Sequence, residues 1–478
     1  MNIWFIVMIV VYLGMLALVG RNSWKKTKSA EDYIMAGSKL GVMVGMLTFA
    51  ATLFSTFTLL GMPEFFRTHG VGSWIFLAIA DAAMFFLILW FGVHLRRAAD
   101  HYGYQGMAGM LSQCYRTRFA GIVYFVGVFL FLVPYVAIQI RGIAEFLVNA
   151  FPELLPPWVW SLAIVCVMLL YSEFGGLRAI IHCDCIQGTI LLIVIWIIAI
   201  GCVRSLGGVE AMFAQVREVN EALLSIPGPK GLLTPQFLIA SFFAIVLIPV
   251  TQPQVTTRLV IIKNKRTMCH MAVGMGIFTM LILVPTIAIG LYGAVKYGAL
   301  PAAEFRANVL LHDPPPFIAA IVLVGLLAAA TSTADSQLFA LGSELRSLFL
   351  VKGRSPLIFT RIAIFCFGAA AWAFAIKSTD QLVSLALNSF KGTALLAPMV
   401  FGAVFCRRKL GPEIIMATGC GVALFLYSLV QSSVGLPEGL GRLPGAIAGI
   451  KFDLFLLMSL AIVTLLSIRI RNMNAEAA

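Results

Sequence analysis

The chain has 478 residues, of which 60% are hydrophobic and 12% charged, and its formal net charge is +13. A soluble domain could not cover so much apolar surface, because roughly half is the usual apolar fraction. Lysine and arginine gather in short loops between long uncharged runs. This distribution is typical of the positive-inside pattern of membrane proteins, and it argues against a nucleic-acid-binding surface.

The uncharged runs predict an all-α integral membrane protein. Each run can cross a hydrocarbon core of about 30 Å as a helix of roughly 20 residues. We expect about thirteen transmembrane helices, over residues 2–20, 40–62, 72–95, 119–149, 157–173, 179–203, 234–254, 269–297, 316–349, 357–377, 381–405, 412–433 and 451–470.

The loops predict the orientation of the chain. Basic residues follow every odd-numbered run; Arg21 follows the first, and Arg258, Lys263 and Lys265 follow the seventh. Because basic loops stay in the cytoplasm, we expect the N-terminus outside and the C-terminus inside. Residues 2–20 have no positive segment before them, so they are predicted to be a span and not a cleaved signal peptide. Short polar termini suit a bacterial inner membrane.

Two segments are poorly suited to an unbroken helix. Residues 51–56 in the second run and 249–254 in the seventh are rich in small, hydroxyl or proline residues. Each segment lies in the first run of a block of five runs, and the two blocks cover residues 40–203 and 234–405. Because each block crosses the membrane an odd number of times, the second block must be inverted in the membrane relative to the first. Inverted repeats with a broken first helix are typical of one transporter class, whose binding site lies where the breaks meet.

The ninth run carries a cluster of oxygen-bearing side chains, namely Ser332, Thr333, Asp335 and Ser336. They lie within about one helical turn, and hydroxyl and carboxylate oxygens are the ligands that hard cations prefer. Serine and threonine alone would more simply bond back to the preceding turn and help helices pack. With Asp335 and a broken helix that can supply free carbonyls, the pattern favours an ion site.

A second carboxylate, Asp184, lies near the start of the sixth run. Either it lies at the cytoplasmic end of an ion path, or it forms an interfacial pair with Arg178. Asp184 and Asp335 together also permit coupling to protons, because acidic groups within spans form proton relays in transporters.

Two cations lie within spans. Arg141 could hold a carboxylate bidentately, although Glu145 four residues later offers an intrahelical pair. Lys391 could neutralise Asp335, meet an anionic solute, or stand in for an ion. No catalytic constellation and no nucleotide-binding motif is found in the sequence, so neither an enzyme nor an ATP-driven pump is expected.

Several motifs, in order, resemble those of the sodium:solute symporter family, which includes sugar, proline, pantothenate, sialic acid and monocarboxylate transporters. They are residues 31–37 (EDYIMAG), Gly61-Met62-Pro63 with Gly70, residues 175–179 (GGLRA) with Asp184 and Gln187, residues 332–337 (STADSQ), and Ala397-Pro398 with Arg407-Arg408. The resemblance covers about residues 30–425. It implies a leucine-transporter-like core of ten helices over 40–405, flanked by one span within 1–39 and two within 406–478.

The resemblance also implies sodium as the coupling ion. Its principal sodium site would use the carbonyls of Ala51, Phe54 and Ala329 and the hydroxyls of Ser332 and Thr333. A second sodium site of some members would use Asp184, Ser332, Asp335 and Ser336. The chain departs from the pattern at Leu53 and Asp335, where several members carry a polar residue and a hydroxyl, respectively, so the number of ions stays open.

Residues 135–139 are similar to the same region of bacterial monocarboxylate symporters, and Arg141 resembles the carboxylate-binding arginine of sialic acid transporters. Both likenesses favour a carboxylate-bearing solute, imported with sodium by alternating access through a monomer. The candidate solute contacts are Tyr135, Gln139, Arg141, Thr251, Gln252, Asn388 and Lys391. The alternatives are a proton-coupled symporter, a passive channel, and a substrate-sensing receptor, although no signalling domain follows Arg471.

Overall fold

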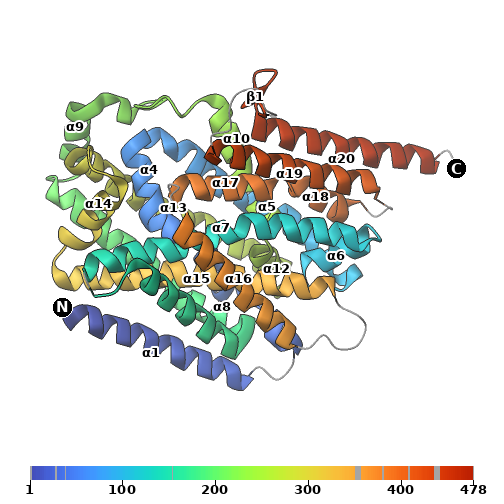
Figure 1. Ribbon diagram of the computed structural model, residues 1–478, viewed down its shortest axis with the longest axis horizontal. Helices are drawn as coiled ribbons and strands as arrows, with labels where there is room; N and C mark the ends of the chain where they lie inside the picture. Colours follow the sequence, from blue (N-terminus) through green and yellow to red (C-terminus); the bar gives the residue numbers. More distant parts are fainter. Residues whose placement is uncertain are drawn as a thin grey trace.

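The computed structural model describes residues 3–26, 30–37, 39–152, 154–349, 357–378, 382–406, 410–434 and 442–476. These residues form helices almost throughout (Figure 1). A two-stranded antiparallel hairpin, β1 (Ala446–Ile447) and β2 (Ile450–Lys451), precedes the last helix. The predicted all-α membrane fold is confirmed.

The elements of the first half, up to the long loop before residue 234, are α1 (Ile3–Lys26), α2 (Ala30–Met35), α3 (Val42–Leu53), η1 (Phe57–Gly61), α4 (Met62–His69), η2 (Val71–Ser73), α5 (Trp74–Tyr102), α6 (Met107–Cys114), α7 (Arg118–Ala150), α8 (Pro157–Ser205), α9 (Val209–Asn220) and η3 (Glu221–Leu224). The elements of the second half are α10 (Pro235–Val246), α11 (Ile248–Thr251), α12 (Pro253–Ile261), α13 (Lys265–Tyr297), α14 (Ala302–Ala307), η4 (Asn308–His312), α15 (Pro316–Leu348), α16 (Leu357–Lys377), α17 (Leu382–Ala394), α18 (Ala397–Phe405), α19 (Pro412–Val434) and α20 (Phe452–Glu476).

Ten helices of the described chain are long and apolar enough to cross a membrane, and the bent pair of 42–53 and 57–69 makes eleven. Residues 157–170 and 235–246 form shorter apolar helices at the fifth and seventh predicted spans. The count of thirteen therefore stays a prediction. The fifth and sixth predicted spans are joined within α8 by Gly176, whose φ of +60° interrupts the helical backbone. Glycine adopts this angle without the steric cost that a side chain imposes.

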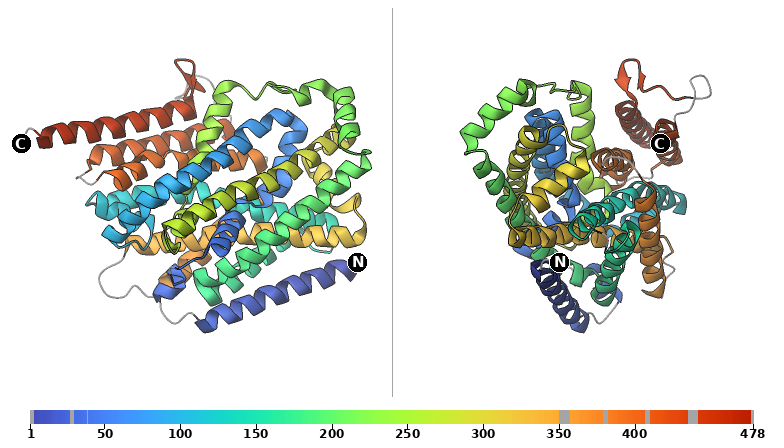
Figure 2. Two further views of the ribbon diagram at one scale, coloured as in Figure 1. Left: turned by 180° about the vertical axis from the view of Figure 1, so that it is seen from behind. Right: turned by 60° about the vertical axis from the view of Figure 1, so that its left-hand side comes forward.

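The helices lie side by side, with α1 and α20 on opposite sides of the bundle (Figures 1 and 2). The N-terminus, α9 and α14 lie at one end, and the C-terminus lies at the other (Figure 1). The orientation predicted from the loops would place the first end outside the cell, and we therefore call it the outer end. In the interior, α15 packs against α1, α3, α7, α8, α12 and α16. Nearly every residue of α15 from 328 to 342 is buried, so its polar side chains must find partners inside the protein.

Both predicted breaks are present, and the two broken helices touch. α3 and α4 meet at 58°, while α10, α11 and α12 are separated at Leu247 and Gln252. Leu40, just before α3, forms a parallel bridge with Ile262, just after α12. The start of the first broken helix thus lies beside the end of the second, as expected for inverted halves.

Candidate ion and solute sites

The break after α3 releases backbone carbonyls inside the protein. Phe54 has an extended backbone (φ −87°, ψ 122°), and its own N–H still bonds the Ala50 carbonyl at 2.8 Å. The next three N–H groups bond side chains instead of the carbonyls of residues 51–53. These bonds are Ser55 to Thr58 Oγ1 at 3.0 Å, Thr56 to Gln139 Oε1 at 3.0 Å, and Phe57 to Ser55 Oγ at 3.1 Å.

Side chains of α15 meet these carbonyls. The hydroxyls of Ser332 and Thr333 donate to the Ala51 carbonyl at 2.9 Å and 3.2 Å, and Ser332 also approaches the Ala329 carbonyl at 3.1 Å. Four of the five predicted ligands of the principal sodium site are therefore in mutual contact, and Phe54 follows the last residue of α3. An all-oxygen set of carbonyls and hydroxyls fits a hard cation.

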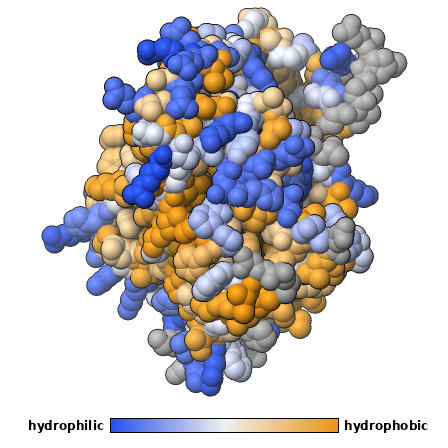
Figure 3. Space-filling model, turned by 90° about the vertical axis from the view of Figure 1, so that its left-hand side faces the viewer, coloured by the Kyte–Doolittle hydropathy of each residue, from blue (hydrophilic) through white to orange (hydrophobic). Residues whose placement is uncertain are grey.

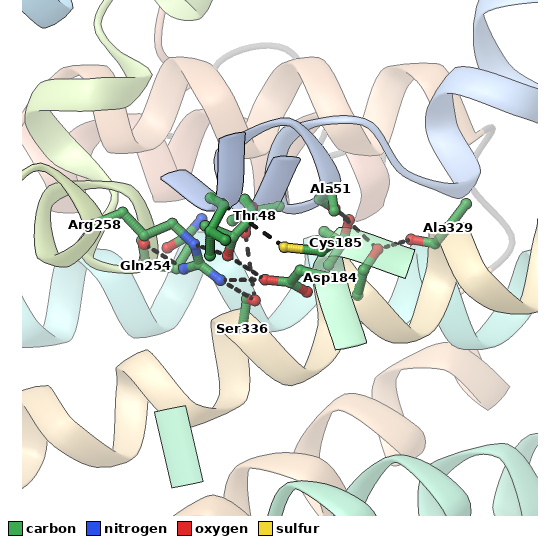
Figure 4. Close-up of polar contacts among 12 residues, drawn as sticks. Thr48, Ala51, Asp184, Cys185, Gln254, Arg258, Ala329 and Ser336 are labelled. Carbon is green, nitrogen blue, oxygen red and sulfur yellow. Dashed lines mark hydrogen bonds and ion pairs between the residues drawn. The ribbon is translucent and has the colours of Figure 1, made fainter. Parts of the chain in front are cut away.

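The predicted second site contains an arginine. Asp184 of α8 and Ser336 of α15 both accept hydrogen bonds from Arg258 Nη2 at 2.7 Å, and Thr48 of α3 donates to Asp184 at 2.6 Å (Figure 4). The alternative pairing of Asp184 with Arg178 is wrong, because Arg178 instead lies 4.0 Å from Asp32.

The assignment of Arg258 to a cytoplasmic loop is also wrong. Its side chain, on α12, is only 1% exposed. The prediction grouped Arg258 with Lys263 and Lys265 because all three follow an apolar run. The position of Arg258 in the sequence could have shown its burial, because this arginine follows the break at Gln252 by only six residues. It also lies one helical turn after Gln254, and its Nη1 donates a hydrogen bond to the Gln254 backbone carbonyl at 2.6 Å.

Asp335 lies apart from these contacts. It is 1% exposed, and neither carboxylate oxygen has a hydrogen-bond partner within the described residues. One turn earlier, Thr331 bonds Tyr12 and Gln187. The expectation that Lys391 neutralises Asp335 is wrong, because Lys391 pairs with Asp453 of α20 at 2.6 Å. A charged Asp335 would need a cation supplied from elsewhere.

Lys391 and Asn388 lie at a large cavity of about 840 Å³ between α4, α9, α17 and the loops around them. Its wall also includes Glu64, Arg67 and Lys230. Figure 3 views the outer end, where hydrophilic side chains lie beside hydrophobic patches. At the opposite end, the space between Tyr104, Arg258 and Ser336 measures only about 10 Å³. A large cavity thus lies at the outer end, and the space around Arg258 at the other end is much smaller.

Four predicted solute contacts are buried beside the breaks. The Tyr135 hydroxyl lies 3.2 Å from Ser55 Oγ, and Gln139 bonds the Thr56 N–H. Thr251 and Gln252 form the second break. Within the described residues the side-chain nitrogen Nε2 of Gln252 has no hydrogen-bond partner. The side-chain oxygen Oε1 of Gln252 accepts a hydrogen bond from Gln254 Nε2 at 2.6 Å.

Arg141 is separated from this group. It pairs with Glu145 at 3.0 Å, as its spacing also allowed, and Glu145 pairs with Arg306 at 2.6 Å. These three side chains line a smaller cavity of about 160 Å³ next to Glu64. The intrahelical pair is thus observed.

Two broken helices that enclose freed carbonyls inside a helical membrane bundle are typical of a secondary transporter. The model of the sodium:solute symporter family matches residues 33–411. The chain belongs to this family. It is therefore a multi-pass sodium-coupled solute symporter and not an enzyme, and sodium is its coupling ion.

Relatives and solved structures agree with this assignment. The chain is 25% identical to the sodium/pantothenate symporter of Haemophilus influenzae, over 91% of this chain and 94% of the relative. It is 24% identical to the sodium/proline symporter of Escherichia coli, over 83% and 82%. A Na⁺-coupled sialic acid symporter in an outward-open state has the same fold, with a TM-score of 0.78 at 16% identity over 98% of both chains.

Proposed function

We propose that the chain imports a small carboxylate-bearing solute, such as a monocarboxylate, together with sodium across a bacterial inner membrane. The charge of the outer cavity carries this proposal. Arg67, Lys230 and Lys391 line it, against the single carboxylate of Glu64 among its wall residues. Glu64 pairs with Arg67, and Asp453 behind the wall pairs with Lys391. The positive charge that remains, that of Lys230, would attract anions to the entrance.

The solute would move from this cavity toward the breaks. Asn388 and Lys391 lie at the entrance. Beneath them, the ring of Phe390 lies 4.9 Å from that of Tyr135 and 6.4 Å from that of Phe57. We infer that these rings form a thin barrier above the proposed contacts of the breaks, which are Tyr135, Gln139, Thr251 and Gln252.

The names of the relatives support the same chemistry. Pantothenate, proline and sialic acid, which appear in the names of three similar proteins, all carry a carboxylate. Sodium at Ala51, Phe54, Ala329, Ser332 and Thr333 would join α3 to α15 while the outer cavity is open. Such a link would stabilise the conformation that accepts solute, as alternating access requires.

The proposal can be tested by thermal unfolding of the purified protein. We expect short-chain monocarboxylates to raise the melting temperature in sodium but not in choline, because a ligand stabilises the state that binds it, by about 2.7 kcal/mol at 100 times its dissociation constant. The matched control is the neutral amide of the same acid. Equal stabilisation by acid and amide would refute the carboxylate assignment.

Asp335 favours a second candidate, in which a proton is transported in addition to sodium. Its buried carboxylate has no hydrogen-bond partner within the described residues, and a proton would neutralise it as well as a metal ion would. This candidate predicts that an inward pH gradient increases the solute uptake that a sodium gradient drives.

A further inference from the structure

The side chain of Arg258 is a permanent positive charge enclosed by the protein. It is among the largest fully buried side chains. All three guanidinium nitrogens donate hydrogen bonds (Figure 4). Nε bonds Thr48 Oγ1 at 2.8 Å, Nη1 bonds the Gln254 carbonyl at 2.6 Å, and Nη2 bonds Asp184 Oδ2 and Ser336 Oγ at 2.7 Å each. Arginine stays protonated in proteins, so this charge cannot be removed by deprotonation.

Two of these acceptors coincide with the second sodium site suggested by the family resemblance. Asp184 Oδ2 and Ser336 Oγ would have to turn toward the ion, yet both already accept hydrogen bonds from Arg258 Nη2, while Asp184 Oδ1 has no hydrogen-bond partner within the described residues. A sodium ion between them would lie within about 4 Å of the guanidinium, where two unit charges repel strongly even at an intermediate dielectric constant. Asp184 Oδ2 and Ser336 Oγ therefore do not fit a second sodium ion in this conformation, and Asp335 is not among the acceptors of Arg258.

The position of Arg258 is fixed from several sides. It lies on α12, directly after the second break, and its partners belong to α3, α8 and α15. The guanidinium thus links α8 and α15, the two helices that hold the predicted second site, and it also links them to α3 and α12. The principal site is built by different atoms, the Ala51 and Ala329 carbonyls and the Ser332 and Thr333 hydroxyls.

We propose that Arg258 is a resident cation that replaces a second sodium ion at Asp184 and Ser336, so that the chain couples a single sodium ion to each solute. This inference rests on the proposed sodium site at Ser332 and Thr333. With a monovalent carboxylate as the solute, one sodium ion per turnover would move no net charge across the membrane.

The test is a count of sodium bound to the purified full-length protein, by equilibrium dialysis with radioactive sodium. We expect a single ion per chain and a sodium titration of the melting temperature with a Hill coefficient of about 1. Two ions bound to the wild type would overturn the inference while leaving the proposed function intact. No bound sodium would overturn the proposed sodium site, and this inference with it.

Variants of Arg258 test whether its charge is what excludes a second sodium ion. Arg258→Met keeps the length of the side chain and removes its charge, so we expect it to bind a second sodium ion that Arg258→Met/Asp184→Asn does not bind. Arg266→Met, at an exposed position, is the matched control and should keep the wild-type count. A folded Arg258→Met that still binds a single ion would contradict the inference. If this variant does not fold, the wild-type count alone decides.

Discussion

Thr333→Val should raise the sodium concentration needed for half-maximal uptake by about 10- to 100-fold. Valine has nearly the shape of threonine but lacks the hydroxyl that meets the Ala51 carbonyl at 3.2 Å. A hydroxyl bound to a charged partner contributes about 1.5–3 kcal/mol, and every 1.4 kcal/mol corresponds to about tenfold in affinity. The measurement is uptake into proteoliposomes over a range of sodium concentrations.

Two controls separate the loss of a ligand from a loss of packing. Thr333→Ser retains the hydroxyl and should stay within about threefold of the wild type, because only a methyl group is lost. Ser343→Ala, on the same helix about 15 Å further along, should leave the sodium dependence unchanged. An unaltered half-saturation concentration in Thr333→Val would remove this residue from the sodium site.

Asp184→Ala should lower the free energy of unfolding by about 3–5 kcal/mol, because it leaves the buried charge of Arg258 without its counter-ion. Asp184 and Arg258 are each 1% exposed and lie 2.7 Å apart. The measurement is the unfolding of purified protein in mixed micelles as the fraction of denaturing detergent increases. Asp184→Ala/Arg258→Met should recover part of the loss, because the unpaired charge is then absent.

The matched control is an ion pair on the surface. Glu413 lies 3.1 Å from Arg471, and the two side chains are 43% and 39% exposed. Pairs exposed to water contribute about 1 kcal/mol or less, so Glu413→Ala should have a small effect. If Asp184→Ala costs no more than Glu413→Ala, the buried pair is not the internal link described above.

The sequence predicts the framework of this protein because membrane helices are encoded locally. Long uncharged runs mark the spans, and the polar segments at 51–56 and 249–254 mark both breaks. Four residues of the predicted principal sodium site, Ala51, Ala329, Ser332 and Thr333, are joined by hydrogen bonds, whereas none of these bonds involves Phe54. Their role as sodium ligands stays a prediction. Spacing along one helix also indicated the pair of Arg141 and Glu145.

Charge pairs between distant helices were not predictable in this way. Lys391 pairs with Asp453, 62 residues later, and Arg258 pairs with Asp184, 74 residues earlier. No local pattern links such residues, and an arginine after an apolar run looks the same whether it lies in a loop or turns inward. Arg258 is buried because α12 begins directly after the second break and lies inside the protein. The break ends the preceding apolar helix before residue 258, so that this arginine does not lie in a loop.

The most direct test of the account is solute accumulation in proteoliposomes containing the purified protein. We expect an inward sodium gradient to concentrate a radiolabelled monocarboxylate, and we expect no accumulation when choline replaces sodium, with pH equal on both sides. Accumulation driven by an inward pH gradient without sodium would contradict the sodium site at Ser332 and Thr333 and would assign the coupling to Asp335.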